Sequence, residues 1–65
     1  MRSELEKLLG QEICVYTVLT DSTAEEDGFE AGLLRRVSDT ALELRRRDGN
    51  LSYVAFKHII RFYAK

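Results

Sequence analysis

This chain has 65 residues, with 10 Lys and Arg against 11 Asp and Glu, a net charge of −1, one Cys, one His and no Pro. The length allows a single domain, residues 1–65, whose core is marginal by itself. One Cys excludes an internal disulfide and, with one His, argues against structural zinc, which leaves association with further copies as the expected support. No apolar run approaches the roughly 20 residues that span a bilayer and the N-terminus is polar, so we expect a cytoplasmic protein without membrane contacts.

The first predicted element is a short helix over residues 3–9. Ser3 and Glu6 have the spacing of a capping box, in which each side chain accepts from an unpaired backbone N–H at the start of a helix. Gly10 can adopt the left-handed conformation that ends a helix. The leucines of this segment fall on one face that must dock on something, because two turns are not stable alone: Leu5, Leu8 and Leu9.

Five short strands follow. The first is rich in β-branched and aromatic residues, and the third alternates Leu42 and Leu44 with Glu43 and Arg45. They are predicted over residues 11–19, 29–37, 40–47, 51–56 and 59–63, and an acidic loop lies at 21–28. Gly32 inside the second strand indicates a bend or a close backbone approach. Asp48-Gly49 predicts a two-residue hairpin turn between the third and fourth strands. We therefore expect a mainly β fold, with one helix and a strongly bent, five-stranded antiparallel barrel over residues 11–64.

Two segments resemble the Sm-like family. Gly32-Leu33-Leu34-x-x-Val37-Ser38-Asp39 with Leu42-x-Leu44 is similar to its first motif, where a bent strand leads into the next. Tyr53-Val54-Ala55-Phe56-Lys57-His58-Ile59 resembles the second motif of its bacterial Hfq members, in which an aromatic residue precedes Lys-His. The resemblance extends over nearly the whole chain and implies an Sm-like barrel, which belongs to the wider SH3-like class.

The resemblance also implies a function. Sm-like proteins form rings of six or seven subunits, in which the fourth strand of one subunit pairs with the fifth strand of the next, and they bind single-stranded RNA. The Lys-His pair of the Hfq members lines the pore, so this role falls on Lys57 and His58, with Phe56 beside them. The predicted edge strands agree, because they contain no Pro and only Arg61 as a charge, and an unprotected edge needs a partner. The resemblance therefore implies that the chain forms a hexamer or heptamer ring and takes part in RNA metabolism or its regulation.

Departures from the family pattern leave a second function open. Asp39 is followed by Thr40-Ala41, which offers no aromatic ring for a base, and the loop at 20–27 is acidic. The first motif is also similar to the C-terminal domain of the ribosome maturation factor RimP, which is a protein-interaction module. The alternative is therefore a structural or protein-interaction barrel that does not bind nucleic acid.

Charge is unevenly distributed along the chain. Residues 1–34 carry two basic and eight acidic groups, and residues 35–65 carry eight basic and three acidic groups. The candidates for contacts with an RNA backbone are Arg45, Arg46, Arg47 and Arg61. The alternative for the arginine run is a solvated hairpin end that discourages edge aggregation. Arg35 and Arg36 point to opposite faces of a strand, so that one of them can pair with Glu43 on the next strand.

The remaining chemistry-bearing residues favour structural roles. Cys14 lies among apolar residues and reads as a buried thiol. Aromatic side chains could stack on bases, but most are expected in the core or between subunits: Tyr16, Tyr53, Phe56, Phe62 and Tyr63. The acidic loop matches no calcium motif, and one His without a nucleophile motif or a phosphate loop supports no catalysis. We therefore expect no enzyme, no cofactor and no metal.

Overall fold

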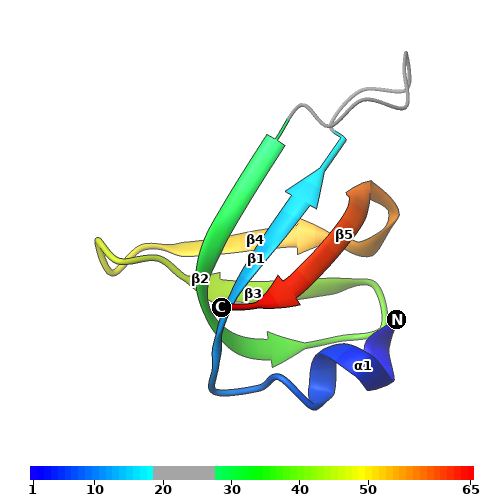
Figure 1. Ribbon diagram of the computed structural model, residues 1–65, viewed down its shortest axis with the longest axis horizontal. Coiled ribbons are helices and arrows are strands. Elements are labelled where there is room, and N and C mark those ends of the chain that lie inside the picture. The colour runs from blue at the N-terminus through cyan, green and yellow to red at the C-terminus, as the bar shows by residue number, and fades with distance from the viewer. Residues whose placement is uncertain (19–27) are drawn as a thin grey trace.

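The computed structural model describes residues 1–18 and 28–65, which form one short helix and one antiparallel sheet (Figure 1). The helix α1 covers Arg2–Glu6, and the strands are β1 (Glu12–Thr17), β2 (Gly28–Val37), β3 (Ala41–Arg45), β4 (Leu51–Ala55) and β5 (Ile59–Ala64). Their order in the sheet is β4-β3-β2-β1-β5. The predicted mainly β fold, with a short helix followed by five antiparallel strands, is confirmed. The acidic loop lies, apart from Gly28, outside the described residues.

The long strand β2 bends across the molecule, so that its two halves belong to different hairpins (Figure 1). Gly28–Leu33 pairs with β1, and Leu33–Val37 pairs with β3. A Cβ atom at Gly32 would lie 2.6 Å from the carbonyl oxygen of Arg45 on β3. This is far inside van der Waals contact, so glycine is required where β2 and β3 approach each other. The close backbone approach predicted at Gly32 is confirmed.

The sheet curves without closing. β4 pairs with β3 and β5 pairs with β1, but within the described residues β4 and β5 do not pair with each other. Each of them therefore has one edge whose backbone groups have no strand partner in residues 1–18 and 28–65. The prediction of strong bending fits this arrangement, whereas a closed barrel is not formed by one chain.

The helix α1 differs from its prediction at both ends. It covers Arg2–Glu6 instead of 3–9, its N-cap is Met1, and no side chain caps it, so the capping box is wrong. Ser3 lies inside the first turn, and the carboxylate of Glu6 lies 3.6 Å from the guanidinium of Arg2 instead of reaching a backbone N–H. Because the helix ends early, Leu9 is exposed and does not share the docking face.

The segment after α1 turns back to the sheet at Gly10. This residue has φ of +84° and its N–H donates to the carbonyl of Leu34 on β2 at 2.9 Å. The left-handed conformation predicted for Gly10 is confirmed.

The β3–β4 hairpin has a longer turn than predicted. The N–H of Gly49 donates to the carbonyl of Arg46, the N–H of Arg46 donates to the carbonyl of Asn50, and Gly49 has φ of +90°. The turn therefore contains Arg47, Asp48 and Gly49, which is the three-residue hairpin with a left-handed glycine. The predicted two-residue turn is wrong, and Arg46 and Arg47 lie beyond the end of β3, where strand alternation does not decide their directions.

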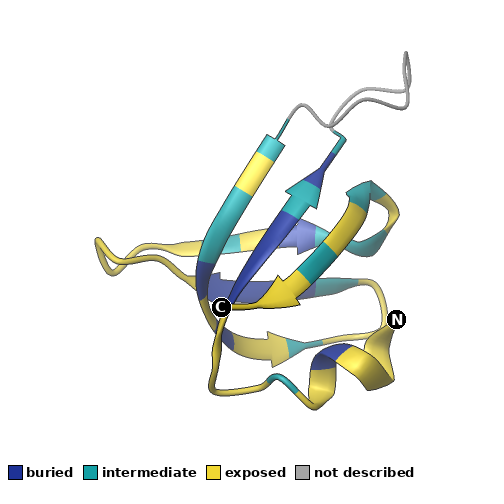
Figure 2. Cartoon of the chain, viewed as in Figure 1, coloured by how far each residue is buried: buried dark blue, intermediate teal, exposed yellow. Residues whose placement is uncertain are grey.

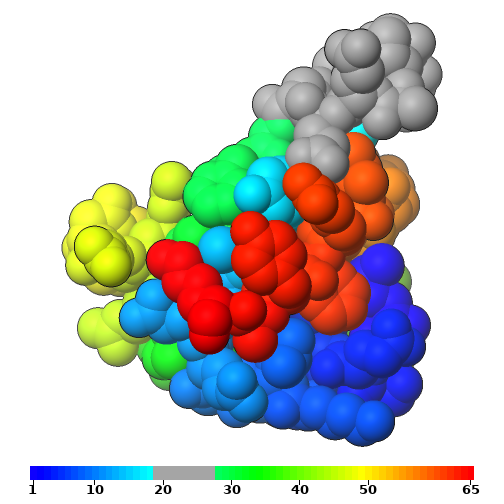
Figure 3. All heavy atoms as spheres, in the orientation of Figure 1, coloured from blue at the N-terminus to red at the C-terminus, as the bar shows by residue number. Residues whose placement is uncertain are grey.

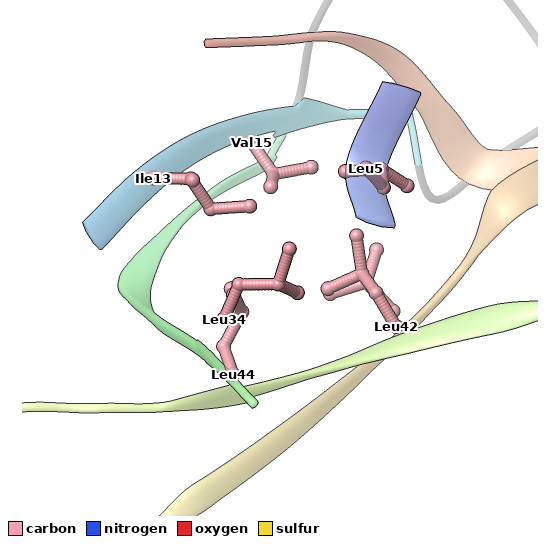
Figure 4. Packing of buried hydrophobic residues seen from close by; sticks show 7 residues of the cluster. Leu5, Ile13, Val15, Leu34, Leu42 and Leu44 are labelled. Atoms are coloured by element: carbon pink, nitrogen blue, oxygen red, sulfur yellow. The ribbon is translucent and has the colours of Figure 1, made fainter. Parts of the chain in front are cut away.

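The core lies on the inner side of the curved sheet, where α1 covers it. Buried side chains from the helix and from four strands meet there, and Figure 2 shows the burial concentrated in β1 and β3. Figure 4 shows six of these side chains pointing toward one another. The cluster consists of Leu5, Ile13, Val15, Leu34, Leu42, Leu44 and Val54. Cys14 points to the other side of β1 and is also buried, as predicted.

Candidate nucleic-acid interface

The segment Phe56–His58 forms a single 3₁₀ turn, η1, between β4 and β5. Its backbone is held from both sides: the N–H of Phe56 donates to the carbonyl of Thr40, and the N–H of Val18 donates to the carbonyl of His58, both at 2.8 Å. The turn therefore has a fixed place between the β2–β3 connection and the end of β1.

The three side chains of η1 point to different surroundings. Phe56 is half-buried and packs against the core, Lys57 is exposed and His58 is half-buried. His58 lines a hollow of about 240 Å³ together with Thr17 and Tyr53, whereas Phe56 and Lys57 line a separate hollow of about 470 Å³. Within one chain, Lys57 and His58 are therefore neighbours that face different hollows.

The four candidate arginines lie in two places. Arg45, Arg46 and Arg47 are exposed around the β3–β4 hairpin and line one shallow hollow beside Gly32. The guanidinium of Arg46 lies 3.6 Å from the carboxylate of Glu30, so part of this positive charge is balanced. The sheet order separates Arg61, on β5, from this hairpin by β2 and β1.

Arg61 belongs instead to an aromatic group on the outer face of the sheet. Phe29, Tyr16 and Arg61 lie opposite one another on β2, β1 and β5, and Tyr63 is the next residue of β5 on this face; we call these four residues the tyrosine row. The guanidinium of Arg61 lies 4.2 Å from the centroid of the Tyr16 ring. On the face shown in Figure 3, the side chains of β5 cover β1 and meet those at the start of β2.

The rings of the tyrosine row also contact one another. The Tyr16 centroid lies 5.1 Å from that of Phe29 and 6.0 Å from that of Tyr63, and the Tyr16 and Tyr63 hydroxyl oxygens are 3.2 Å apart. The hydrogen bond with Tyr16 is the main cause that raises the pKa of the Tyr63 hydroxyl to about 12. The sequence predicted Tyr16 in the core or between subunits, but it could not supply the partners of Tyr16.

The two edge strands expose large apolar side chains. Leu51 and Tyr53 on β4 are 46% and 69% exposed, and Ile60 and Tyr63 on β5 are 42% and 46% exposed. An exposed apolar edge strand invites pairing with another strand. Both ends of the sheet therefore have the properties of association surfaces.

Two further classes of site are absent from the described residues. No group of three or more His, Cys, Asp or Glu side chains in residues 1–18 and 28–65 could hold a metal ion. In the same residues, no helix has the length and apolar character needed to cross a bilayer.

Comparison with known proteins does not decide between the functions left open above. No protein-family model matches the chain, no curated protein matches its sequence and no solved structure matches its fold. The function must therefore be argued from the chain itself.

Proposed function

We propose that this chain is an Sm-like barrel protein that assembles into a hexamer or heptamer ring and binds single-stranded RNA near the pore. The observation that carries the proposal is the pair of unpaired edges at opposite ends of one curved sheet, β4 and β5. Pairing β4 of one copy with β5 of the next is a head-to-tail contact, which repeats until a ring closes. It also places the exposed apolar side chains of the two edge strands beside one another.

The position of η1 supports RNA binding in such a ring. Because η1 connects the two edge strands, every copy would present Lys57 and His58 beside a subunit boundary. An exposed ammonium group supplies a point charge for a phosphate, and an imidazole can donate to or stack on a base. Repetition around the ring would gather these groups although they face different hollows in one copy.

The assembly is tested by light scattering coupled to size exclusion. We expect a mass of six or seven protomers, and Leu51→Lys and Ile60→Lys should each shift the protein to smaller species by placing a charge on an association edge. Leu33→Lys is the matched control, because Leu33 is exposed on β2 in the middle of the sheet. A wild-type protein that remains monomeric at high concentration would remove the ring.

RNA binding is tested by fluorescence anisotropy with uridine-rich and adenine-rich oligonucleotides at several salt concentrations. We expect binding that weakens as salt rises, and a loss of affinity for Lys57→Ala and His58→Ala. Lys7→Ala is the control, because Lys7 is exposed just after α1. Absence of salt-sensitive binding by the assembled protein would leave only the alternative function.

The alternative is a protein-interaction module that accepts a peptide strand on the β4 edge. Exposure of 69% for Tyr53, beside the exposed Leu51, favours it, since strand addition uses the backbone edge for affinity and such side chains for specificity. This function predicts a stable monomer that binds extended peptides and does not bind RNA.

A further inference from the structure

A second row of side chains crosses the outer face at the other end of the sheet. Arg36 on β2 lies opposite Glu43 on β3, and Glu43 lies opposite Tyr53 on β4. We call these three residues the glutamate row. They line one hollow of about 320 Å³, next to the small side chain of Ala41.

Glu43 is the unusual member of this row. It is only 7% exposed, yet within the described residues its carboxylate has no hydrogen bond and no ion pair. Arg36 lies opposite it in register, but the two charged groups do not come within ion-pair distance. Among the described residues no buried side-chain oxygen lacks a hydrogen-bond partner, so the carboxylate of Glu43 keeps contact with water at the hollow that it lines. A hydrogen-bond donor that enters this hollow can therefore replace the water on the carboxylate.

The flanking side chains indicate what kind of donor fits. The ring of Tyr53 is 69% exposed and offers a flat apolar surface beside the carboxylate. A planar group that stacks on this ring can direct its edge at Glu43. Arg36 is exposed on the opposite side of Glu43 and can bind a phosphate or a ribose hydroxyl.

We propose that the glutamate row binds a guanine base. Guanine carries two adjacent donors, N1–H and N2–H, which match the two oxygens of a carboxylate in a bidentate contact. Uracil presents one N–H between two carbonyl oxygens, which the carboxylate would repel. Adenine and cytosine each present an amino group beside a ring nitrogen that only accepts. The chemistry of Glu43 therefore selects guanine over the other three bases.

A guanine base that belongs to an RNA strand can reach the glutamate row only if the proposed RNA binding is correct. Recognition of the base itself does not depend on that proposal. If β5 of a neighbouring copy pairs with β4, it extends the sheet beside Tyr53 and leaves the outer face open. A guanosine in single-stranded RNA and a free guanine nucleotide share the same base, so the experiment needs one arm for each.

The RNA arm uses labelled heptamers of uridine whose central base is guanine, inosine, adenine, cytosine or uracil. We expect the guanine heptamer to bind about tenfold more tightly than the uracil heptamer, with inosine between them because it lacks the N2 amino group. Glu43→Gln should abolish this preference, because the amide replaces one of the two accepting oxygens with an NH2 group that donates. Glu4→Gln, which removes the same charge from α1, should retain it.

Tyr53→Leu separates stacking from base reading. Loss of the ring should weaken binding for every central base, since stacking tolerates any base, while the order of preference persists. If Glu43→Gln lowers thermal stability but leaves the order of preference unchanged, the carboxylate is structural and the inference is overturned. Equal binding of all five heptamers by the wild type overturns the guanine site and leaves RNA binding intact.

The nucleotide arm follows the backbone amide signals of residues 43 and 53 during titration with guanosine monophosphate or uridine monophosphate. Larger shifts with the guanine nucleotide, in the absence of any RNA binding, would support the guanine site and overturn the proposed function. A lack of response to both nucleotides and to all heptamers would overturn both.

Discussion

The tyrosine row and the glutamate row occupy the same outer face of one sheet, but they differ in whether their polar groups have partners within the described residues. In the tyrosine row, Tyr16 contacts Phe29, Tyr63 and Arg61, so that each polar group has a partner within the chain. In the glutamate row, the most buried charge, Glu43, has no partner among the described residues. The first row is built to hold β2, β1 and β5 together, whereas the second keeps an acceptor for something outside the chain.

The bend of β2 produces this division, and breaking it has the largest expected effect. Gly32→Ala would place a Cβ atom 2.6 Å from the carbonyl oxygen of Arg45 and force β2 away from β3. We expect a loss of about 3 kcal/mol in the free energy of unfolding, measured by urea denaturation. Leu33→Ala, at an exposed neighbouring position, should cost far less. A Gly32→Ala protein as stable as the wild type would mean that the bend does not require glycine.

The next effect concerns the tyrosine row as a source of stability. Tyr16→Ala removes two aromatic contacts and the position of Arg61 over the ring, and should cost about 2 kcal/mol. Tyr53→Ala is the matched change in the glutamate row and should cost less than about 0.5 kcal/mol, because that ring is 69% exposed. Equal losses for the two variants in urea denaturation would remove the difference between the rows.

A smaller change in stability is expected for the carboxylate of the glutamate row. Glu43→Gln removes a charge that has no partner among the described residues and that keeps contact with water, so the free energy of unfolding should change by no more than about 1 kcal/mol in either direction. A loss above about 2 kcal/mol would show that Glu43 supports the fold through Arg36, contrary to the division proposed between the rows.

The sequence predicted the elements of both rows but not their partners. All five strands were located from the sequence: β-branched and aromatic residues indicated β1, and leucines alternating with charged residues indicated β3. Gly32 indicated the close approach of β2 and β3. The choice between Arg35 and Arg36 as the residue facing Glu43 stayed open, because it depends on an irregularity of the β2–β3 register between Leu34 and Arg36. Register shifts of this kind change which side chains share a face without leaving a signal in composition.

Chain ends and turns were the other source of error, because single contacts decide them. The pairing of Arg2 with Glu6 replaced the predicted capping box at the start of α1. The hydrogen bond from Gly49 to Arg46 belongs to a hairpin turn that is longer than predicted. Arg46 and Arg47 therefore lie outside β3, where their side chains do not alternate between the two faces of the sheet. The candidate site was affected most, since its arginines and the η1 side chains lie at such places.

The last effect is the smallest and tests whether the tyrosine row is satisfied within the chain. The hydrogen bond between Tyr63 and Tyr16 raises the pKa of the Tyr63 hydroxyl to about 12, so the fold favours the neutral phenol. The stability from this group is fully present below the unfolded pKa of about 10 and is lost as pH rises through the folded value. Ultraviolet absorbance of the phenolate should therefore show one late-titrating tyrosine, which Tyr63→Phe removes. Urea denaturation should show the wild type losing stability relative to Tyr63→Phe over the same pH range. If Tyr63→Phe leaves the late titration in place, the hydrogen bond does not hold the proton, and the tyrosine row is no better satisfied than the glutamate row.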